Sequence, residues 1–419
     1  MKRLLRSNTI FCLYTVVFLS LSYGVYLTSG TKYLDKLAIY YVSLFLFYLG
    51  LGLIGKRLKL IEKIKSIKVK KFQVKPIFIV LPIVLFILIH FIILGGSPTI
   101  KAMSLGTWQE IAKLRESIGT NVHPLIGYGS SIILKACLPF FLLYLLIKEE
   151  KLWYWILFAV GIFYVFSMMQ KSFIVGFLFP SFVYSLISRK FLFAAKFIVI
   201  MIFVVVSLSK IANPNVSQEK QDHISDNTEV IVPIDTLTQT VADTTNFEEV
   251  IENADKTPSK LSVLIYGLQR RIMITPGKIV SAWFEHIPKD KPFLYGEGYR
   301  IIAKIKGKEH RSYASELYPL VNPKYAKQGF KGTVNTASFM YEYANFGTWG
   351  LVLSGFILAF IFVFIEQFFV DDLILKLSLN LYPLLFLTST AITTLMFSGG
   401  WSFVIVFYYI FLFRNKASN

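Results

Sequence analysis

The chain has 419 residues, of which 55% are hydrophobic and only 16% charged, with a mean hydropathy of +0.58. Soluble globular proteins carry roughly 25% charged residues, so this composition excludes a cytosolic enzyme, a disordered chain and a disulfide-stabilised scaffold. The net charge of +19 comes from 44 Lys and Arg against 25 Asp and Glu. Because much of it flanks apolar runs, it indicates membrane topology and contact with anionic lipids, and no nucleic-acid-binding motif accompanies it.

Apolar runs of membrane-spanning length predict an all-α polytopic membrane protein with about ten transmembrane helices. The first run follows a basic start, and no cleavage-site pattern comes after it, so we expect it to be a retained span. A very tight turn near Gln170 predicts that the fifth and sixth spans form a helical hairpin. The predicted spans cover approximately residues 9–29, 36–54, 76–95, 125–147, 152–169, 171–188, 191–209, 347–369, 378–398 and 401–413.

Loop charge predicts the orientation of these spans. Residues 56–75 hold nine Lys and Arg against one acid, which is typical of a cytoplasmic loop. With an even number of spans, both termini are expected in the cytoplasm and the loops at about 96–124 and 210–346 on the outer side.

The chain divides into three predicted parts. Residues 1–209 hold the first seven spans, residues 210–346 form one large outer loop, and residues 347–419 hold the last three spans and a cytoplasmic tail. Within the loop, residues 211–255 contain ten acids and one base, which is typical of a mobile, solvated insert. Residues 256–338 contain fifteen bases and five acids among aromatics and prolines, so we expect an ordered, cationic part.

The common signatures of soluble catalysis are missing. The sequence has no G-x-x-x-x-G-K-[ST], no G-x-S-x-G and no H-E-x-x-H, and no cluster of Asp and His at metal-ligand spacing. ATP-driven transport and zinc hydrolysis are therefore unsupported, and we expect no metal or other cofactor.

Cations of the outer loop are the first candidates for chemistry. The sequence places two guanidinium groups, Arg270 and Arg271, and the ammonium group of Lys278 within one short segment. We expect this segment to lie near the membrane. Arginine binds phosphate oxygens bidentately and stays charged at working pH, so the pair suits a lipid diphosphate; contact with lipid head groups is the alternative. Lys171, at the outer start of the sixth span, is a second candidate, although it can equally reach the head groups.

The basic half of the loop holds further candidates for binding. Arg300, His310 and Arg311 lie in charged runs; His310 with Arg311 suits acid–base chemistry, and a solvated face is the alternative. Aromatic side chains suit stacking on sugar rings or interfacial anchoring. These are Tyr266, Trp283, Tyr295 and Tyr341.

The most informative stretch runs from Gly332 to Gly350, directly into a predicted span. Gly347 and Gly350 stand three apart at a helix start, which permits close backbone approach. Glu342 lies about one helical turn from Asn345, and a carboxylate there can act as a general base or hold a sugar hydroxyl. Helix capping and ordinary packing are the alternative.

This arrangement resembles the bacterial Wzy-type O-antigen polymerases, which join polysaccharide repeat units. The resemblance rests on the many spans with one large late outer loop, on the basic Lys171 and Arg270–Arg271, and on one motif. In that motif Asn335-Thr336 precedes Tyr343-Ala344-Asn345-Phe346-Gly347 and Gly350, similar to the "NT…YxNFGxxG" segment of the group. The related O-antigen ligases carry a His eleven residues before the first Gly; Thr336 stands there, which favours polymerase over ligase.

The resemblance implies a glycosyltransferase with a GT-C-like architecture in the bacterial inner membrane, active at the periplasmic face in lipopolysaccharide or related surface-polysaccharide biosynthesis. It would move a growing glycan from undecaprenyl diphosphate en bloc to a new lipid-linked repeat unit, without a metal. A chain-length-regulating co-polymerase is the expected partner. Alternatives are an O-antigen ligase and a lipid-linked glycan flippase or secondary transporter.

Within that resemblance the candidate residues take separate roles. The catalytic candidates are Arg270, Arg271 and Glu342. The candidates for substrate binding are Lys171, Lys278, Arg300, His310, Arg311, Asn335, Tyr343 and Asn345.

Overall fold

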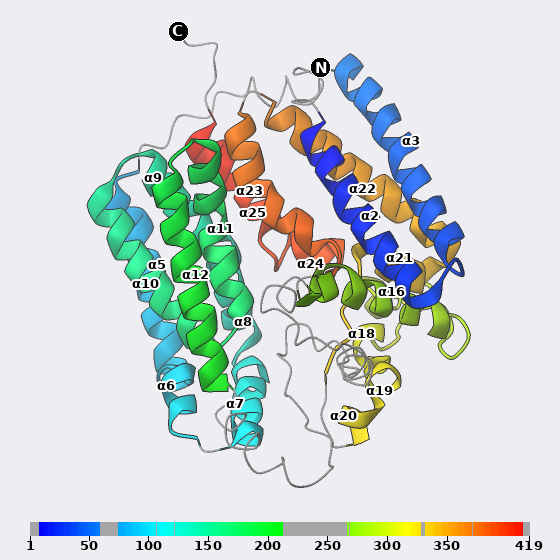
Figure 1. Cartoon of the computed structure of the whole chain (residues 1–419), viewed down its shortest axis with the longest axis horizontal. Helices are drawn as coiled ribbons and strands as arrows, with labels where there is room; N and C mark the ends of the chain where they lie inside the picture. The colour runs from blue at the N-terminus through cyan, green and yellow to red at the C-terminus, as the bar shows by residue number, and fades with distance from the viewer. Residues whose placement is uncertain are drawn as a thin grey trace, which may run out of the picture. The chain divides into compact units, whose positions relative to one another are not determined.

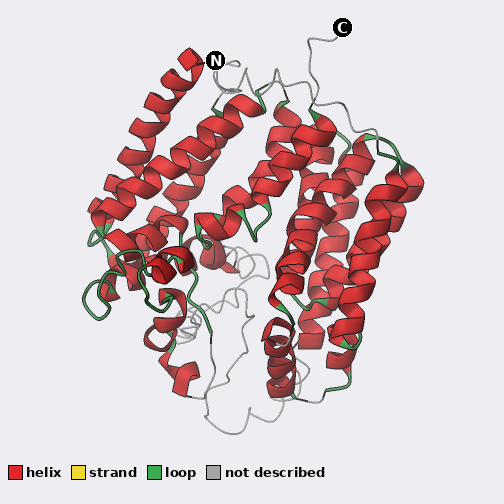
Figure 2. Cartoon of the chain, turned by 180° about the vertical axis from the view of Figure 1, so that it is seen from behind, coloured by secondary structure: helices red, strands yellow, loops and turns green. Residues whose placement is uncertain are grey.

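The described part of the chain is entirely helical. No strand occurs in it (Figure 2), which confirms the all-α prediction. The predicted loop at 56–75 and the acidic insert at 211–255 lie mostly outside the described residues. The computed structural model describes residues 8–58, 74–105, 107–120, 122–212, 266–267, 269–327, 332–370 and 372–413.

Several helices have the length and hydropathy of membrane spans, as predicted. Among the described residues seven qualify: Thr9–Ser29, Leu34–Gly55, Pro76–Leu94, Pro124–Ile147, Phe191–Ile211, Thr348–Phe368 and Ile392–Leu412. Three shorter apolar helices accompany them, Lys151–Ser167, Lys171–Ile187 and Leu373–Phe386. The chain is thus a polytopic membrane protein by its helices, and the count of ten spans stays a prediction.

The ninth predicted span, at 378–398, is wrong as a single helix. Helix α23 (Leu373–Phe386) ends twelve residues early, and α24 (Ile392–Met396) begins only after a turn. In that turn the Thr388 hydroxyl donates to the Leu385 carbonyl at 2.9 Å. Side-chain hydroxyls that bond local carbonyls compete with the helical pattern, and apolar composition alone does not reveal this.

The chain forms two compact units, each joining segments that are distant in sequence. Unit 1 contains Met1–Glu62, Ile234–Val370 and Leu384–Thr393. Unit 2 contains Lys63–Pro233, Asp371–Pro383 and Thr394–Asn419.

Unit 1 combines three long helices with a set of short ones. Helices α2 (Thr9–Ser29), α3 (Leu34–Leu58) and α22 (Thr348–Phe368) run alongside one another (Figure 1). Helices α3 and α22 touch at the backbone, because a Cβ on Gly355 would lie 2.9 Å from the Leu44 nitrogen. We call the described residues between 266 and 346 the late segment. Its helices are η2 (Arg270–Ile274), α16 (Thr275–His286), α17 (Arg300–Ile305), α18 (Tyr313–Glu316), α19 (Tyr318–Val321), α20 (Pro323–Lys327) and α21 (Ser338–Phe346).

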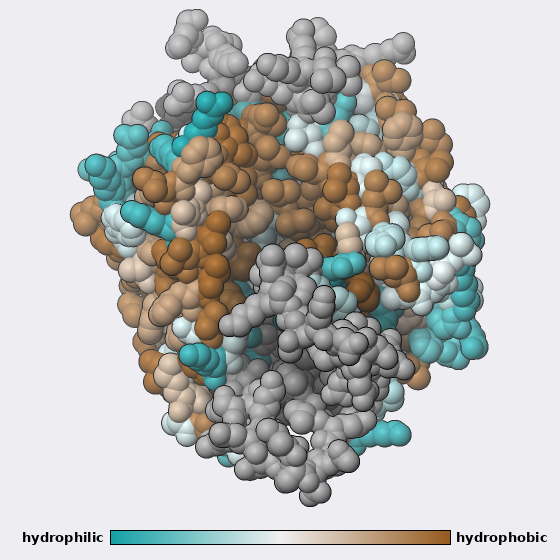
Figure 3. Space-filling view, in the orientation of Figure 1, coloured by the Kyte–Doolittle hydropathy of each residue, from teal (hydrophilic) through white to brown (hydrophobic). Residues whose placement is uncertain are grey.

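The late segment gathers at the end of unit 1 where α2 and α3 are joined (Figure 1). Hydrophilic side chains collect over it, at the lower right of Figure 3, whereas hydrophobic ones cover the long helices. Ala314 and Val334 connect its parts, since the Val334 amide donates to the Ala314 carbonyl at 2.7 Å. The polar chemistry of unit 1 is therefore concentrated at one end of its long helices.

Unit 2 is a bundle of apolar helices with small polar clusters inside. The ring of His90 contacts the Tyr164 hydroxyl at 2.7 Å, and the Ser130 hydroxyl lies 2.9 Å from the same oxygen. All three side chains are buried, so this cluster stabilises helix packing. The helices are α5 (Pro76–Leu94), α6 (Pro98–Met103), α7 (Trp108–Thr120), α8 (Pro124–Ile132), η1 (Ile133–Cys137), α9 (Leu138–Ile147), α10 (Lys151–Ser167), α11 (Lys171–Ile187), α12 (Phe191–Ala212), α25 (Trp401–Phe407), η3 (Tyr408–Leu412) and most of α23 and α24.

Candidate functional site

The late segment is fixed to the membrane span α2 by direct backbone contact. A Cβ on Gly24 would lie 1.9 Å from the Met273 carbonyl oxygen, and one on Gly277 would lie 2.2 Å from the Gly24 carbonyl carbon. No side chain fits between the two backbones. One turn further on, the Ser281 hydroxyl lies 3.1 Å from that of Thr28 and 3.0 Å from that of Ser29.

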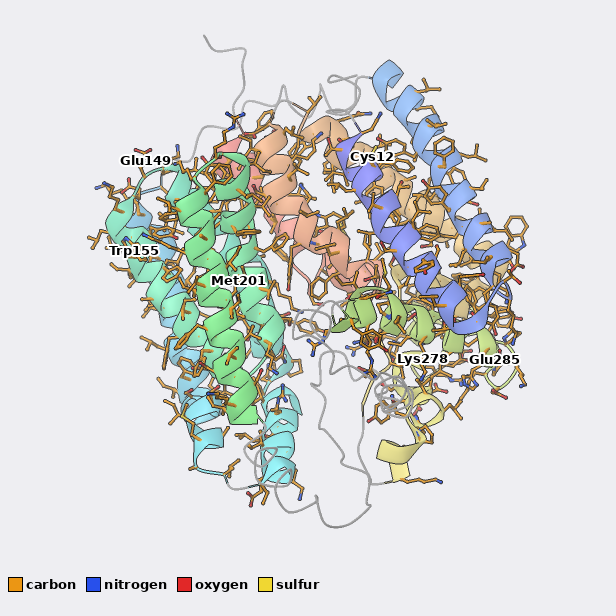
Figure 4. All side chains as sticks on the ribbon, in the orientation of Figure 1. Cys12, Glu149, Trp155, Met201, Lys278 and Glu285 are labelled. Atoms are coloured by element: carbon orange, nitrogen blue, oxygen red, sulfur yellow. The ribbon has the colours of Figure 1, made fainter. Side chains whose placement is uncertain are left out.

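The predicted cationic group lies at this crossing. Arg270 and Arg271 open η2, which contacts α2 directly. Lys278, labelled in Figure 4, follows on α16. The side chain of Arg271 is exposed, whereas those of Arg270 and Lys278 are half-buried. The structure thus holds two guanidinium groups next to the last turns of a candidate membrane span. Their role as phosphate ligands stays a prediction.

Helix α16 is also tied to the start of α3. Glu285 bonds both Lys32 and Tyr33, and these hydrogen bonds hold the pKa of the Glu285 carboxyl well below its usual range, with Lys32 the larger contributor. Lys36 lies 5.0 Å from the ring centre of Phe284 and 5.3 Å from that of Tyr343. These contacts lock the amphipathic helix against the ends of the spans.

Tyr343, a predicted substrate ligand, lies within this packing. Its side chain is buried, and its hydroxyl donates to the Ile287 carbonyl at 3.2 Å while it accepts from Lys36 at 3.2 Å. Both hydrogen-bonding functions of the hydroxyl are therefore used inside the protein.

The junction of α21 and α22 explains the spacing of its glycines. Gly347 ends α21 and starts α22 with φ 62° and ψ −140°, a conformation that side chains disfavour. A Cβ on Gly350 would lie 1.9 Å from the Glu342 carbonyl oxygen. The predicted close backbone approach is confirmed, and it fixes α21 against a membrane span.

Asn345 holds the loop of residues 294–299. Its Oδ1 accepts from the amides of Gly296 at 3.1 Å and Gly298 at 3.2 Å, and its Nδ2 donates to the Tyr341 carbonyl at 2.8 Å. The Leu294 amide adds a hydrogen bond to the Ala344 carbonyl at 2.9 Å. The buried amide side chain of Asn345 thus positions a loop, and a direct contact with substrate stays a prediction.

Glu342 is the chemically unusual residue of the late segment. It is only 2% exposed, its Oε1 accepts from the Tyr299 hydroxyl at 3.3 Å, and its Oε2 has no partner. Burial raises the pKa of this carboxyl to about 7, although the hydrogen bond from Tyr299 works in the opposite direction. A carboxyl with that pKa exchanges protons near neutral pH, as a general acid or base must.

An open polar depression in the surface, which we call the cavity, lies between the loop of residues 294–299 and residues 308–316. Its volume is about 680 Å³, and it is lined by Glu297 and by side chains between Lys308 and Glu316. This is within the range of roughly 300–1,000 Å³ that is usual for small-molecule sites. His310 and Arg311, both predicted ligands, line it. The sequence alone does not reveal the cavity, because its walls come from two stretches, one at Glu297 and one between Lys308 and Glu316.

Both cations in the cavity lining are already paired with carboxylates. Arg311 donates two hydrogen bonds to Glu316, at 3.2 and 3.0 Å, and Lys308 bonds Glu297 at 2.6 Å. The Lys308 ammonium lowers the pKa of Glu297, and the hydrogen bond from Glu316 raises that of Arg311, so both pairs stay ionised near neutral pH. His310 contacts the Gly298 carbonyl through Nε2 at 3.1 Å.

The other predicted ligands lie apart from the cavity lining. Arg300 opens α17 and is exposed, and Asn335 is exposed in the stretch before α21. Lys171 belongs to unit 2, where it starts α11 directly after the turn at 168–170. That turn joins α10 to α11, as predicted, and Arg115 donates to its Met169 carbonyl at 3.0 Å.

Two buried ionisable residues were missed by sequence reasoning. In unit 1, Glu366 of α22 accepts from the Ile10 amide at the start of α2. In unit 2, Lys376 of α23 is fully buried, one turn before Asn380, which accepts from the Trp401 indole at 2.8 Å. A charge within an apolar helix is the signal that marks both. Trp283, considered for sugar stacking, is fully buried and donates to the Val334 carbonyl at 3.2 Å.

Comparison with known proteins adds no relative. No protein-family model, no curated protein and no solved structure matches this chain. Among the described residues, no three His, Cys, Asp or Glu side chains gather as metal ligands do. The features of the site that can carry chemistry are the cations beside a candidate membrane span, a buried carboxyl and a polar cavity.

Proposed function

We propose that this protein is a membrane glycosyltransferase that polymerises undecaprenyl-diphosphate-linked oligosaccharide repeat units at the periplasmic face of the bacterial inner membrane. The observation that carries the proposal is the backbone crossing of α2 by η2 and α16, at Gly24 and Gly277. It holds Arg270 and Arg271 beside the last turns of a candidate membrane span, and the proposal places the diphosphate of a membrane-embedded prenyl lipid next to them.

The proposed reaction is a displacement at an anomeric carbon. The bond between the growing glycan and its diphosphate breaks, and undecaprenyl diphosphate leaves with the bonding electrons. A hydroxyl oxygen of the new repeat unit forms the new glycosidic bond, and its proton passes to a base. Guanidinium groups stabilise the charge that develops on the leaving phosphate, and removing one such contact typically slows a reaction by about 10²–10³-fold.

Glu342 is the proposed base. Its Oε2 has no partner, and a pKa of about 7 lets it accept a proton at neutral pH. Because the carboxyl is buried, the acceptor hydroxyl reaches it only when substrate displaces the segment around Tyr299. This motion is part of the proposal.

The test replaces the two arginines in a host that lacks its own copy of the protein. Arg270→Ala with Arg271→Ala should leave only single repeat units attached to the lipid A core. Lys289→Ala with Lys304→Ala removes the same charge from exposed positions of the late segment, and should preserve long chains.

The surface polysaccharide separates the alternatives. A ligase defect leaves long chains that are not attached to the core, and a flippase defect leaves no repeats at the surface. Long attached chains in the double arginine variant would refute the diphosphate clamp. Purified protein that does not elongate lipid-linked repeat units would refute the polymerase.

A further inference from the structure

The cavity lined by Glu297 and by residues 308–316 is distinct from the arginine pair. It holds three carboxylates but only two permanently charged cations, Lys308 and Arg311. Each of these cations is already bonded to a carboxylate of the same cavity, at 2.6 and 3.0 Å. Lys291, which lies outside the lining, bonds Glu316 as well, so three cations balance the three carboxylates. A diphosphate entering here would meet no unpaired cation from this lining. The cavity is therefore unsuited to the phosphate end of a lipid-linked substrate.

The same pairs suit a neutral ligand that carries many hydroxyl groups. Arg311 has five N–H donors and uses two for Glu316, so others can point to a ligand. Carboxylate oxygens have several lone pairs and accept hydroxyl protons while they remain in an ion pair. When His310 is neutral, its Nε2 donates to the Gly298 carbonyl, and its Nδ1 remains as an acceptor. Ser312 and Ser315 add two exposed hydroxyls.

The polar groups of the cavity are held in place before a ligand binds. The Arg311 guanidinium lies 5.3 Å from the ring centre of Tyr313, whose hydroxyl bonds the Pro292 carbonyl. Lys291 adds a second cation to Glu316 at 3.0 Å. Preorganised donors and acceptors lower the entropy cost of binding a flexible ligand.

The cavity is also connected to the proposed base. Glu297, in its wall, lies on the loop that Asn345 fixes through the amides of Gly296 and Gly298. Two residues later, Tyr299 donates to Glu342. A sugar in the cavity is thus positioned, through one short loop, relative to the buried carboxyl.

We propose that this cavity binds the sugar portion of the substrate as a neutral polyhydroxyl chain, and that the diphosphate binds elsewhere. The inference rests on the proposed function, because it names which part of the lipid-linked oligosaccharide the cavity receives.

The test measures binding of two probes to the purified full-length chain in mild detergent. One probe is the repeat-unit oligosaccharide released from its lipid and freed of phosphate; the other is inorganic pyrophosphate. Ser315→Trp fills the cavity from an exposed position, and Ser315→Ala is the matched control. Ser315→Trp should weaken oligosaccharide binding by about tenfold or more and leave pyrophosphate binding unchanged. Ser315→Ala should weaken oligosaccharide binding by less than tenfold and should also leave pyrophosphate binding unchanged.

Salt concentration gives an independent readout. Oligosaccharide binding should change little between low and high salt, because a neutral ligand is not screened, whereas pyrophosphate binding should weaken. Oligosaccharide binding that is absent, or that Ser315→Trp leaves unchanged, would overturn the sugar site. Pyrophosphate binding that depends on Ser315 would do the same.

The two proposals fail in different ways. If the purified protein elongates lipid-linked repeats equally well with Ser315→Trp, and oligosaccharide binding is unaffected, the sugar site is wrong and the polymerase stands. If Ser315→Trp abolishes oligosaccharide binding but the wild-type protein elongates nothing, the sugar site stands and the polymerase is wrong.

Discussion

Glu342→Gln isolates the energetic effect of one buried carboxyl. Burial raises the pKa of Glu342 from an ordinary value of 4.5 to about 7, so the folded state disfavours the ionised form. The neutral carboxyl contributes its full share to the free energy of unfolding below pH 4.5, and this contribution is lost as the pH rises through about 7. The difference corresponds to about 3 kcal/mol at roughly 1.4 kcal/mol per tenfold change in proton affinity. Glutamine is neutral at every pH, so the variant should lose this pH dependence.

The assay is unfolding of wild type and Glu342→Gln in mixed micelles at several pH values between 4 and 8, followed by the helical signal in circular dichroism. Stability of the wild type relative to the variant should fall with rising pH, mostly between pH 4.5 and 7. Glu297→Gln is the control of opposite sign, because Lys308 lowers the pKa of Glu297 and that stability is lost as pH falls. Parallel pH profiles for wild type and Glu342→Gln would refute a buried, proton-exchanging carboxyl.

Two further substitutions test how α21 is held. Gly350→Ala forces a Cβ against the Glu342 carbonyl, 1.9 Å away, and should lower the free energy of unfolding by about 1–3 kcal/mol; Gly52→Ala, where a Cβ meets nothing within 4 Å, is the control and should cost nothing measurable. Asn345→Ala leaves the amides of Gly296 and Gly298 without an acceptor, which should lower the free energy of unfolding of this loop by about 1–3 kcal/mol. The loosened loop should then be cleaved by chymotrypsin at the exposed Tyr295 about tenfold faster. Asn345→Asp keeps the accepting oxygen and should slow that cleavage again; equal cleavage rates in wild type and Asn345→Ala would contradict the clamp.

Local pattern was sufficient to predict much of the helical framework. The first span was predicted at 9–29 and α2 runs from Thr9 to Ser29, because hydropathy marks a lipid-facing helix directly. Gly347 and Gly350 indicated a close backbone contact, since only glycine tolerates one. The turn near Gln170 followed from the short polar break between two apolar runs.

The candidate site was less predictable, because its chemistry depends on contacts across long sequence separations. Nothing in the local sequence indicates that Glu342 is buried, or that Tyr299 is its partner 43 residues away. Arg311 and His310 were predicted as ligands from charge, but charge does not reveal that Arg311 is paired with Glu316. Lys376 is a further example. The sequence shows a single lysine in an apolar helix, but it does not show that this lysine is fully buried.

The backbone contact between Gly24 and Gly277 limits which part of the late segment can move. The two backbones are in direct contact there, and the Ser281 hydroxyl lies within hydrogen-bond distance of Thr28 and Ser29 one turn further on, so α16 is held on α2 at two successive turns. The polymerase reaction proposed above requires room for a glycan that lengthens with each turnover. The late segment meets a candidate span again at Gly350, where a Cβ would lie 1.9 Å from the Glu342 carbonyl oxygen. We expect that room in the described residues between these two backbone contacts, 289–327 and 332–337.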